Sequence, residues 1–286
     1  MEPHNKTPRD RLAREKLHES RILKSNVVTR QFHRRVLGIL SNKCESQFLI
    51  TGISPARLFL SRELLSLKTL FKVHPRACLI RVSRTLDSKQ GKRILRPLTR
   101  IDRGFKVASV TPDLQSLFRK TPAKAWLHDL RKGKDPGKIP LSQNLSNLIR
   151  LVTLYKYGGI YLDTDFIVLK SFQFFGLRNS IAAQGVDPVS KNWTRLNNAV
   201  LLFDKNHPLL FRFIEDFETG FDGNKWGHNG PYMVSRVVER VKEVLKFTIL
   251  PPTSFYHVVY HVDKKPRNEE EARWIEGFSY RIRISK

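Results

Sequence analysis

The stretch at residues 145–169 constrains the fold most, because it predicts a helix and a strand separated by two glycines. Apolar residues at helical spacing predict a helix over residues 145–157. One face of this helix carries Leu145, Leu148, Ile149 and Val152, and the opposite face carries Asn147, Arg150 and Leu154. Gly158 and Gly159 then end the helix, since glycine tolerates the left-handed backbone that helix ends adopt. The apolar run at residues 160–169 predicts a strand.

Strands and helices alternate along most of the chain. Apolar runs predict strands at residues 47–51, 77–82 and 105–110, and helical spacing predicts helices at residues 61–71 and 231–244. This alternation predicts an α/β fold with a largely parallel sheet. The first 43 residues are polar and basic, so we expect a stem-like helix or a disordered tail over residues 1–43. A single domain should occupy residues 44–286.

Two carboxylates interrupt the apolar strand that follows the glycine pair. Asp163 and Asp165 are two residues apart, so in a strand they point to the same face and could converge on one ligand. Burying both without compensation is costly, and a hard divalent cation that also binds diphosphate oxygens would compensate them. The alternative is a solvated or salt-bridged pair of acids. The order of helix, glycines, strand and acids favours a ligand crevice at the carboxyl ends of the strands.

Three motifs in order carry a resemblance to a known family. They read YGGIYLDTDF at residues 157–166, RLNNA at residues 195–199 and WGHNGP at residues 226–231. The chain resembles the α-1,4-glycosyltransferases related to lactosylceramide 4-α-galactosyltransferase, with the plant-type members nearest. The resemblance implies a Rossmann-like, nucleotide-sugar-binding fold of GT-A type. It also implies a UDP-sugar donor, Mn²⁺ or Mg²⁺, and α-linked transfer of a hexose, with retention, to a glycan or glycolipid.

The same resemblance assigns the catalytic and metal-binding residues. Asp163 and Asp165 match the motif that holds the metal and the diphosphate. Asn198 could hold the reacting face of the sugar, and His228 could contact phosphate or acceptor. For His228 a purely structural role stays open, and Asn198 could instead satisfy a turn.

Further residues are expected to bind the donor. Arg150 and Asn147 match helix positions expected to contact it, although an exposed helix face would explain them equally well. Asn197 could hydrogen-bond sugar hydroxyls and Trp226 could form a wall of the sugar pocket. Donor-contacting residues also include the pair Gly158 and Gly159.

The charge of the chain is strongly positive and uneven. The formal net charge is +26, and residues 1–140 carry 32 lysines and arginines against 11 aspartates and glutamates. Such a basic half would suit nucleic acid or another polyanion, which is one alternative function. However, the basic residues are interspersed with apolar ones, and no zinc-ligand spacing or basic zipper accompanies them. We therefore expect nucleotide sugar and glycan or glycolipid as partners, with nucleic acid unlikely.

The resemblance also predicts where the protein works, and raises a second alternative. Relatives are Golgi enzymes with lumenal catalytic domains and type II membrane topology, and sequons at Asn5, Asn144 and Asn192 are compatible with this. The printed chain contains neither an anchor-like apolar stretch nor the His-x-Trp-Asn-Lys segment of relatives. We therefore expect a C-terminally truncated domain, with a catalytically silent protein as the alternative. Cys44 and Cys78 permit one disulfide, but two buried free thiols are the interpretation we favour.

Overall fold

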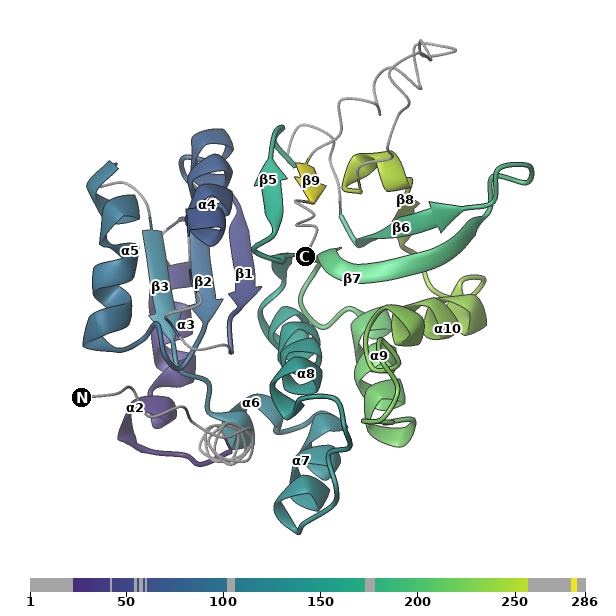
Figure 1. Cartoon of the computed structure of the whole chain (residues 1–286), viewed down its shortest axis with the longest axis horizontal. Helices are drawn as coiled ribbons and strands as arrows, with labels where there is room; N and C mark the ends of the chain where they lie inside the picture. Colours follow the sequence, from purple (N-terminus) through teal and green to yellow (C-terminus); the bar gives the residue numbers. More distant parts are fainter. Residues whose placement is uncertain are drawn as a thin grey trace, which may run out of the picture.

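The computed structural model describes residues 23–41, 43–53, 56, 59, 61–101, 106–172, 178–256 and 279–281. Within these residues the main sheet consists of β1 (Gln47–Thr51), β2 (Cys78–Val82), β3 (Lys106–Val110), β4 (Gly159–Leu162), β6 (Ser180–Val186), β7 (Trp193–Phe203) and β8 (Thr248–Leu250). Their spatial order is β3-β2-β1-β4-β7-β6-β8 (Figure 1). Strands β1 to β4 are parallel, β7 is antiparallel to both of its neighbours, and β6 and β8 are parallel. The predicted α/β fold with a largely parallel sheet is confirmed.

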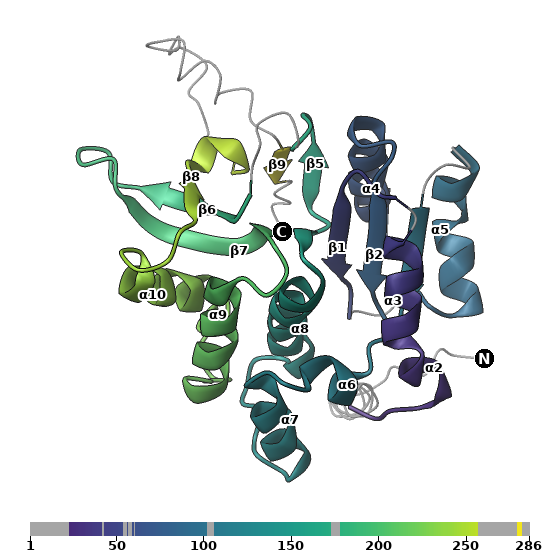
Figure 2. The ribbon, with the colours of Figure 1, turned by 180° about the vertical axis from the view of Figure 1, so that it is seen from behind.

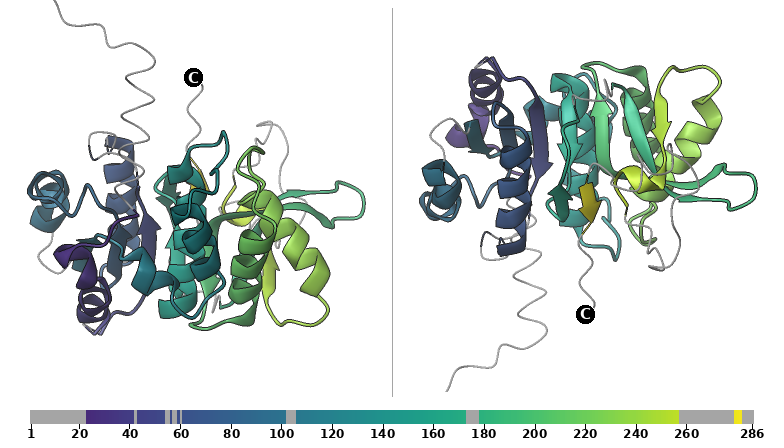
Figure 3. Two further views of the ribbon diagram at one scale, coloured as in Figure 1. Left: turned by 90° about the horizontal axis from the view of Figure 1, so that it is seen from below. Right: turned by 90° about the horizontal axis from the view of Figure 1, so that it is seen from above.

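Helices cover both faces of this sheet. In chain order they are α2 (Val27–Arg30), α3 (Phe32–Leu40), α4 (Ser61–Val73), α5 (Lys89–Ile101), α6 (Leu114–Phe118), α7 (Ala123–Arg131), α8 (Leu141–Tyr157), α9 (Pro208–Thr219) and α10 (Pro231–Val241), followed by the 3-10 turn η3 (Pro252–Ser254). Apolar residues of α4 and α5 pack on one face, and those of α3 and α6 to α10 pack on the other. The hairpin between β6 and β7 projects from the body at the end farthest from α5 (Figure 3).

Strand β1 shows how the sequence builds two cores at once. Phe48 and Ile50 belong to the cluster under α4 and α5, whereas Leu49 between them belongs to the cluster under α8. Successive side chains of a strand point to opposite faces, so a strand covered on both sides is apolar throughout. The predicted strand boundaries at residues 47–51 agree with β1, and those of β2 and β3 agree to within one residue.

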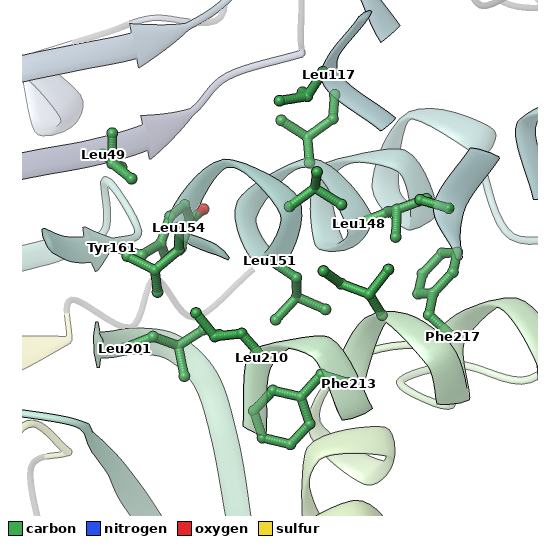
Figure 4. Close-up of a cluster of buried hydrophobic side chains, with 14 of the residues drawn as sticks. Leu49, Leu117, Leu148, Leu151, Leu154, Tyr161, Leu201, Leu210, Phe213 and Phe217 are labelled. Atoms are coloured by element: carbon green, nitrogen blue, oxygen red, sulfur yellow. The ribbon is translucent and has the colours of Figure 1, made fainter. Parts of the chain in front are cut away.

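Helix α8 lies in the middle of the molecule (Figure 1), and its apolar side chains pack between the sheet and α9 (Figure 4). It begins at Leu141, four residues before the predicted start, and Leu148, Leu151 and Leu154 are all fully buried. The alternative of an exposed helix face therefore does not hold for Arg150, which is buried, and Asn147 is only partly exposed. Packing on two sides explains why Arg150 is also buried, with 7% of its surface exposed.

The strand predicted at residues 160–169 is divided into two strands that belong to different sheets. Strand β4 ends at Leu162, Asp163 follows it, and Thr164 and Asp165 form a turn. Strand β5 (Phe166–Val168) then pairs antiparallel with β9 (Ser279–Arg281). The two acids are thus not neighbours on one strand face, and the same-face argument does not apply. They lie at the carboxyl end of β4, where a crevice was expected.

The N-terminal region contains a packed helix. Phe32 and Val36 of α3 are buried, and α3 lies against β2 and β3 (Figure 2). Arg35 forms two hydrogen bonds of 2.6 Å with the carboxylate of Asp87. Within the described residues the packed structure therefore begins before Cys44. The boundary between an extension and a domain remains a prediction.

Cys44 and Cys78 form a disulfide, with their Cα atoms 5.4 Å apart. The interpretation of two free thiols is therefore wrong. The bond joins the segment after α3 to the first residue of β2, a pairing that spacing alone did not reveal. Among the described residues no helix is both long and apolar enough to cross a bilayer.

Candidate active site

A cavity of about 620 Å³ opens at the carboxyl ends of β1 and β4. Thr51 and Gly52 contribute to its wall at the end of β1, and Asp163 contributes at the end of β4. Helix α8 and strands β6 and β7 supply polar side chains, while Trp226, Gly227, Pro231 and Tyr232 form part of the rim. Ligands of α/β proteins bind in crevices of this kind, outside the carboxyl ends of parallel strands.

Arg150 and Asp163, which line the cavity, form a tight cluster with the fully buried Tyr161. Arg150 Nη2 lies 3.2 Å from Asp163 Oδ1, and Arg150 Nη1 donates to Asp163 Oδ2 at 3.4 Å and to the Asn198 carbonyl at 2.7 Å. The Tyr161 hydroxyl donates to Asp163 Oδ1 at 2.7 Å. The Arg150 guanidinium also lies 4.5 Å from the centre of the Tyr161 ring. These contacts fix the orientation of the Asp163 carboxylate.

A chain of hydroxyls extends this cluster toward the wall. Thr51 Oγ1 lies 2.8 Å from the Tyr161 hydroxyl and 2.7 Å from Ser146 Oγ. Because an ionised carboxylate only accepts hydrogen bonds, Tyr161 must donate to Asp163 and accept from Thr51. Thr51 in turn accepts from Ser146. The direction of every hydrogen bond in this chain therefore follows from the charge on Asp163.

Burial and charge set the protonation states here. Burial alone lowers the pKa of Arg150, but the charge on Asp163 opposes this and leaves the pKa raised overall. Burial raises the pKa of Tyr161 far above its usual range, although Arg150 opposes the shift. Arg150 is therefore cationic and Tyr161 is a neutral donor at physiological pH.

Amide side chains line the part of the cavity formed by α8, β6 and β7. Asn198 Nδ2 donates to Asn147 Oδ1 at 3.2 Å, and Asn197 Nδ2 donates to Gln184 Oε1 at 2.9 Å. All four residues line the cavity. Asn197 and Asn198 lie within β7 rather than in a turn before a strand. Clustered amides offer both donors and acceptors without net charge, which suits sugar hydroxyls.

Carboxylates at the end of β4 suit a hard divalent cation. Among the described residues lining the cavity, Asp163 is the only acidic one, and Asp165 lies in the turn that follows it. No group of three or more His, Cys, Asp or Glu suited to a metal occurs among the described residues. Mg²⁺ in enzymes is commonly held by one or two carboxylates together with substrate phosphates and water. The donor set therefore fits a metal that binds together with a diphosphate, not a metal held by protein side chains alone.

Aromatic side chains stand at the rim of the cavity. Trp226 and Tyr232 both line it, although 69% and 50% of their respective surfaces are exposed. Gly227 between them has a φ of 72°, and a Cβ there would lie 2.9 Å from the Tyr232 ring. The glycine thus lets the chain turn closely against Tyr232. Exposed aromatic faces beside a polar pocket provide apolar surfaces for a ligand.

Four residues with expected site roles do not line the cavity, namely Asp165, which follows Asp163 in the chain, and His228, Gly158 and Gly159, which lie elsewhere. His228 Nε2 lies 2.9 Å from the Gly220 carbonyl, and the His228 carbonyl accepts from Arg236 at 2.8 Å. Gly158 and Gly159 lie at the opposite end of β4 from Asp163. A Cβ on Gly158 would lie 2.8 Å from a backbone nitrogen of Lys205, and a Cβ on Gly159 would lie 2.6 Å from the carbonyl oxygen of Gln47. Chain packing accounts for these glycines without a ligand.

Sequence reasoning missed several residues of the site. Thr51, Ser146, Gln184 and Arg195 line the cavity, and Tyr161 is buried against Asp163. Tyr161 carried a detectable signal, because it lies two residues before Asp163 in a predicted strand. Arg195 lies within the RLNNA motif, but no role was expected for it. The others are ordinary polar residues whose convergence depends on the fold.

The chain is similar to known glycosyltransferases. The family described as "Glycosyltransferase sugar-binding region containing DXD motif" matches residues 61–186, and the "Alpha 1,4-glycosyltransferase conserved region" matches residues 202–280. Lactosylceramide 4-alpha-galactosyltransferase of Mus musculus is 36% identical over 162 residues, which cover 54% of this chain and 42% of that protein. The sequence of that name from Pongo pygmaeus is 34% identical over 162 residues, covering 54% of this chain and 69% of the relative.

The matched region spans about half the length, or less, of several of these relatives. For the Homo sapiens lactosylceramide 4-alpha-galactosyltransferase it amounts to 49% of the protein, at 32% identity. A solved structure of an active-site mutant of LgtC is 11% identical and has a TM-score of 0.45, covering 82% of this chain and 86% of that one.

Proposed function

Since the chain belongs to the α-1,4-glycosyltransferase family, we propose that it transfers a hexose from a UDP-sugar to a glycan or glycolipid. The new bond would be an α linkage formed with retention of configuration. The observation that carries the proposal is the cavity in which Asp163, clustered amides and exposed aromatic rings meet at the carboxyl ends of the strands. The transferred sugar would be galactose, glucose or N-acetylglucosamine.

Asp163 and Asp165 would hold Mn²⁺ or Mg²⁺ together with the diphosphate of the donor. When bound, such a cation stabilises the negative charge that develops on the departing nucleoside diphosphate. Arg150 and Tyr161 orient the Asp163 carboxylate through the contacts of 2.7–3.4 Å described above. Orientation matters because a displaced ligand weakens every interaction that depends on its position.

The amide cluster would hold the transferred sugar. Asn147 and Asn198 are linked to each other, and Asn197 is linked to Gln184, so their orientations are set before a ligand arrives. This fixed arrangement lowers the cost of ordering side chains on binding. Trp226 and Tyr232 at the rim would pack against the acceptor.

Two features support a lumenal location. Disulfides such as Cys44–Cys78 form and persist in oxidising compartments, including those of the secretory pathway. Asn192 of one sequon is exposed, whereas Asn144 is 3% exposed and accepts a hydrogen bond from Asn229, so it is unsuitable for glycosylation. The sequon at Asn5 lies outside the described residues. We propose the Golgi lumen with type II topology.

Calorimetry of UDP binding with and without Mn²⁺ tests the proposal. We expect wild-type protein to bind UDP tightly only when the metal is present. In Asp165→Asn, addition of the metal should no longer increase the affinity for UDP. Asp165→Asn is preferred to a change at Asp163, because Asp163 is the counterion of Arg150. An exposed matched control is Asp204→Asn, whose carboxylate pairs with Arg178.

Transfer assays with UDP-galactose, UDP-glucose and UDP-N-acetylglucosamine then identify the donor sugar. Binding of UDP without turnover of any donor would indicate a catalytically silent member of the family. Absence of UDP binding by folded wild-type protein would contradict the proposed function.

A further inference from the structure

Arg81, the penultimate residue of β2, is a buried arginine whose guanidinium is only partly satisfied by the described residues. Only 5% of its surface is exposed. Its Nε and Nη1 atoms are buried and have no hydrogen-bond partner in the described part of the chain. A buried donor that bonds to nothing costs free energy comparable to a lost hydrogen bond, so these two nitrogens need an explanation.

The surroundings of Arg81 stabilise its position without satisfying these donors. The guanidinium carbon lies 4.2 Å from the centre of the Phe59 ring. The charge of Glu63 raises the pKa of Arg81 against burial, and the Glu63 carboxylate also accepts a hydrogen bond of 2.7 Å from Arg62. Burial lowers the pKa of Arg81 to about 10, so the side chain still carries its charge at neutral pH.

Gly52 separates this guanidinium from the cavity. Gly52 lines the cavity wall, and a Cβ built on it would lie 2.6 Å from Arg81 Nη2 and 2.9 Å from Arg81 Nε. The φ of Gly52 lies outside the left-handed region, so the backbone itself would accept alanine. The absence of a side chain at position 52 is therefore what leaves Arg81 room beside the cavity.

The strand order places Arg81 next to the β1 end of the crevice, although Arg81 itself does not line it. Arg81 is on β2, Gly52 follows β1 and Asp163 follows β4, and these strands are successive neighbours in the sheet. Adjacent strands are about 4.8 Å apart, so β2 lies roughly 10 Å from β4. The amides of β7 lie on the other side of β4. With the sugar on the amide side and the diphosphate at Asp163, the nucleoside extends toward β1 and β2.

We propose that Arg81 is a donor-binding residue that reaches past Gly52 and hydrogen-bonds the nucleoside half of the nucleotide sugar. This inference rests on the proposed function. Guanidinium groups only donate hydrogen bonds, and the carbonyl oxygens of a uracil base are uncharged acceptors of suitable geometry. The unpaired nitrogens of Arg81 would gain the partners that the described residues do not supply.

The test compares uridine, UMP and UDP binding, with Mn²⁺ present, in wild type and Arg81→Met. Loss of a hydrogen bond from a charged donor predicts affinity reduced roughly 10- to 100-fold. The factor should be similar for all three ligands, because all three contain the nucleoside. Arg81→Lys, which keeps the charge but loses the planar fork, should recover only part of the affinity.

Gly52→Ala provides a second variant in which the arginine remains. Its methyl group would displace the guanidinium, so we expect weaker binding of the same three ligands. In the Arg81→Met background the alanine should add little further loss. Arg35→Met, which removes an arginine paired with Asp87 outside this cavity, is the control and should leave nucleotide affinity unchanged.

Several outcomes would overturn the inference. Equal affinities of wild type and Arg81→Met would exclude a binding role, and a loss confined to UDP would assign Arg81 to the terminal phosphate instead. If Arg81 has only a structural role, Arg81→Met would lower the melting temperature without changing the nucleotide affinity of the folded fraction. If wild-type protein binds no UDP at all, the proposed function fails first, so the two failures are distinguishable.

Discussion

Two arginines lie buried near the carboxyl ends of the parallel strands. Arg150 on α8 has 7% of its surface exposed, and Arg81 on β2 has 5%. Both terminal nitrogens of Arg150 have partners, namely the Asp163 carboxylate and the Asn198 carbonyl. Arg81 has an aromatic ring beside it, but no hydrogen bond to a described residue satisfies its Nε or Nη1.

The difference separates two uses of a buried cation. The charge of Arg150 is neutralised within the protein, so this arginine belongs to the folded structure and orients Asp163. Removing one partner of such a pair leaves a buried charge uncompensated. Arg81 makes no such ion pair with a described residue, so its removal should cost little stability and should instead affect a ligand. Stability and binding measurements therefore distinguish the two residues.

The largest effect on stability is expected for Asp163→Ala. This change leaves Arg150 buried without its counterion and should lower the free energy of unfolding by about 3 kcal/mol, measured by urea denaturation. Asp165→Ala should cost much less. The double variant Asp163→Ala/Arg150→Met should regain most of the loss. If Asp163→Ala alone is as stable as wild type, Arg150 does not depend on Asp163.

A buried histidine should produce the next largest effect, as pH changes, although the charge of Glu45 opposes the effect of burial on the pKa of His74. His74 Nε2 accepts from the Phe172 backbone nitrogen at 3.4 Å and the ring stacks on Phe172, while burial lowers the pKa of His74 to about 4. The usual pKa of histidine is about 6.5, so below this pH His74 is protonated in the unfolded chain but stays neutral in the folded chain. The free energy of unfolding therefore falls as the pH drops from 6.5 toward 4.

The comparison with His74→Gln isolates this contribution, because glutamine keeps an acceptor and does not titrate. Between pH 7.5 and 4.5 wild type should lose about 2 kcal/mol more unfolding free energy than the variant. Parallel pH profiles for the two proteins would show that His74 is not kept neutral by the fold.

A smaller effect is expected for Tyr161→Phe, which removes the hydroxyl between Thr51 and Asp163. Stability should fall by about 1 kcal/mol, and turnover by roughly tenfold, because Asp163 is less firmly oriented. Tyr157→Phe is the matched control. The Tyr157 hydroxyl lies outside the cavity, 2.8 Å from His33 Nδ1. The control variant should lose stability without losing turnover. Equal turnover losses would mean that stability alone explains the effect.

The smallest effect on stability is expected for Arg81→Met. The free energy of unfolding should fall by less than about 1 kcal/mol, or should rise, because the removed charge had no ion pair to lose. A loss as large as that of Asp163→Ala would show that Arg81 is a structural cation. The contrast between the two arginines would then disappear.

Local patterns predicted the elements that local sequence determines. The boundaries of β1 to β3 and the end of α8 agree with the structure, because apolar runs and the glycine pair specify them. A stem-like helix was one of the alternatives for residues 1–43, but the packing of α3 into the core was not predicted, since its buried Phe32 and Val36 lie among basic residues. The break after Leu162 was missed because β5 pairs with β9, more than a hundred residues away.

The candidate site was predictable only in part, for the same reason. The motif acids, Arg150 and the two asparagines were identified from motif order and resemblance. Thr51 is far along the chain from Ser146 and Tyr161, and only the fold brings its hydroxyl within 2.8 Å of each of their hydroxyls. Arg81 had no sequence signal, because its significance depends on what the described residues around it leave unpaired.

The glycine pair between α8 and β4 has a consequence for motion. Gly158 and Gly159 have φ values of 69° and 107°, and they connect the helix to the strand without an intervening loop. Backbone atoms of Lys205 and Gln47 lie so close that the pair has little space to flex. A hinge at this junction would have to break those contacts, so α8 and β4 should move as one rigid unit. Any opening and closing during a catalytic cycle must therefore involve other segments, and the distance between Arg150 and Asp163 should stay constant throughout.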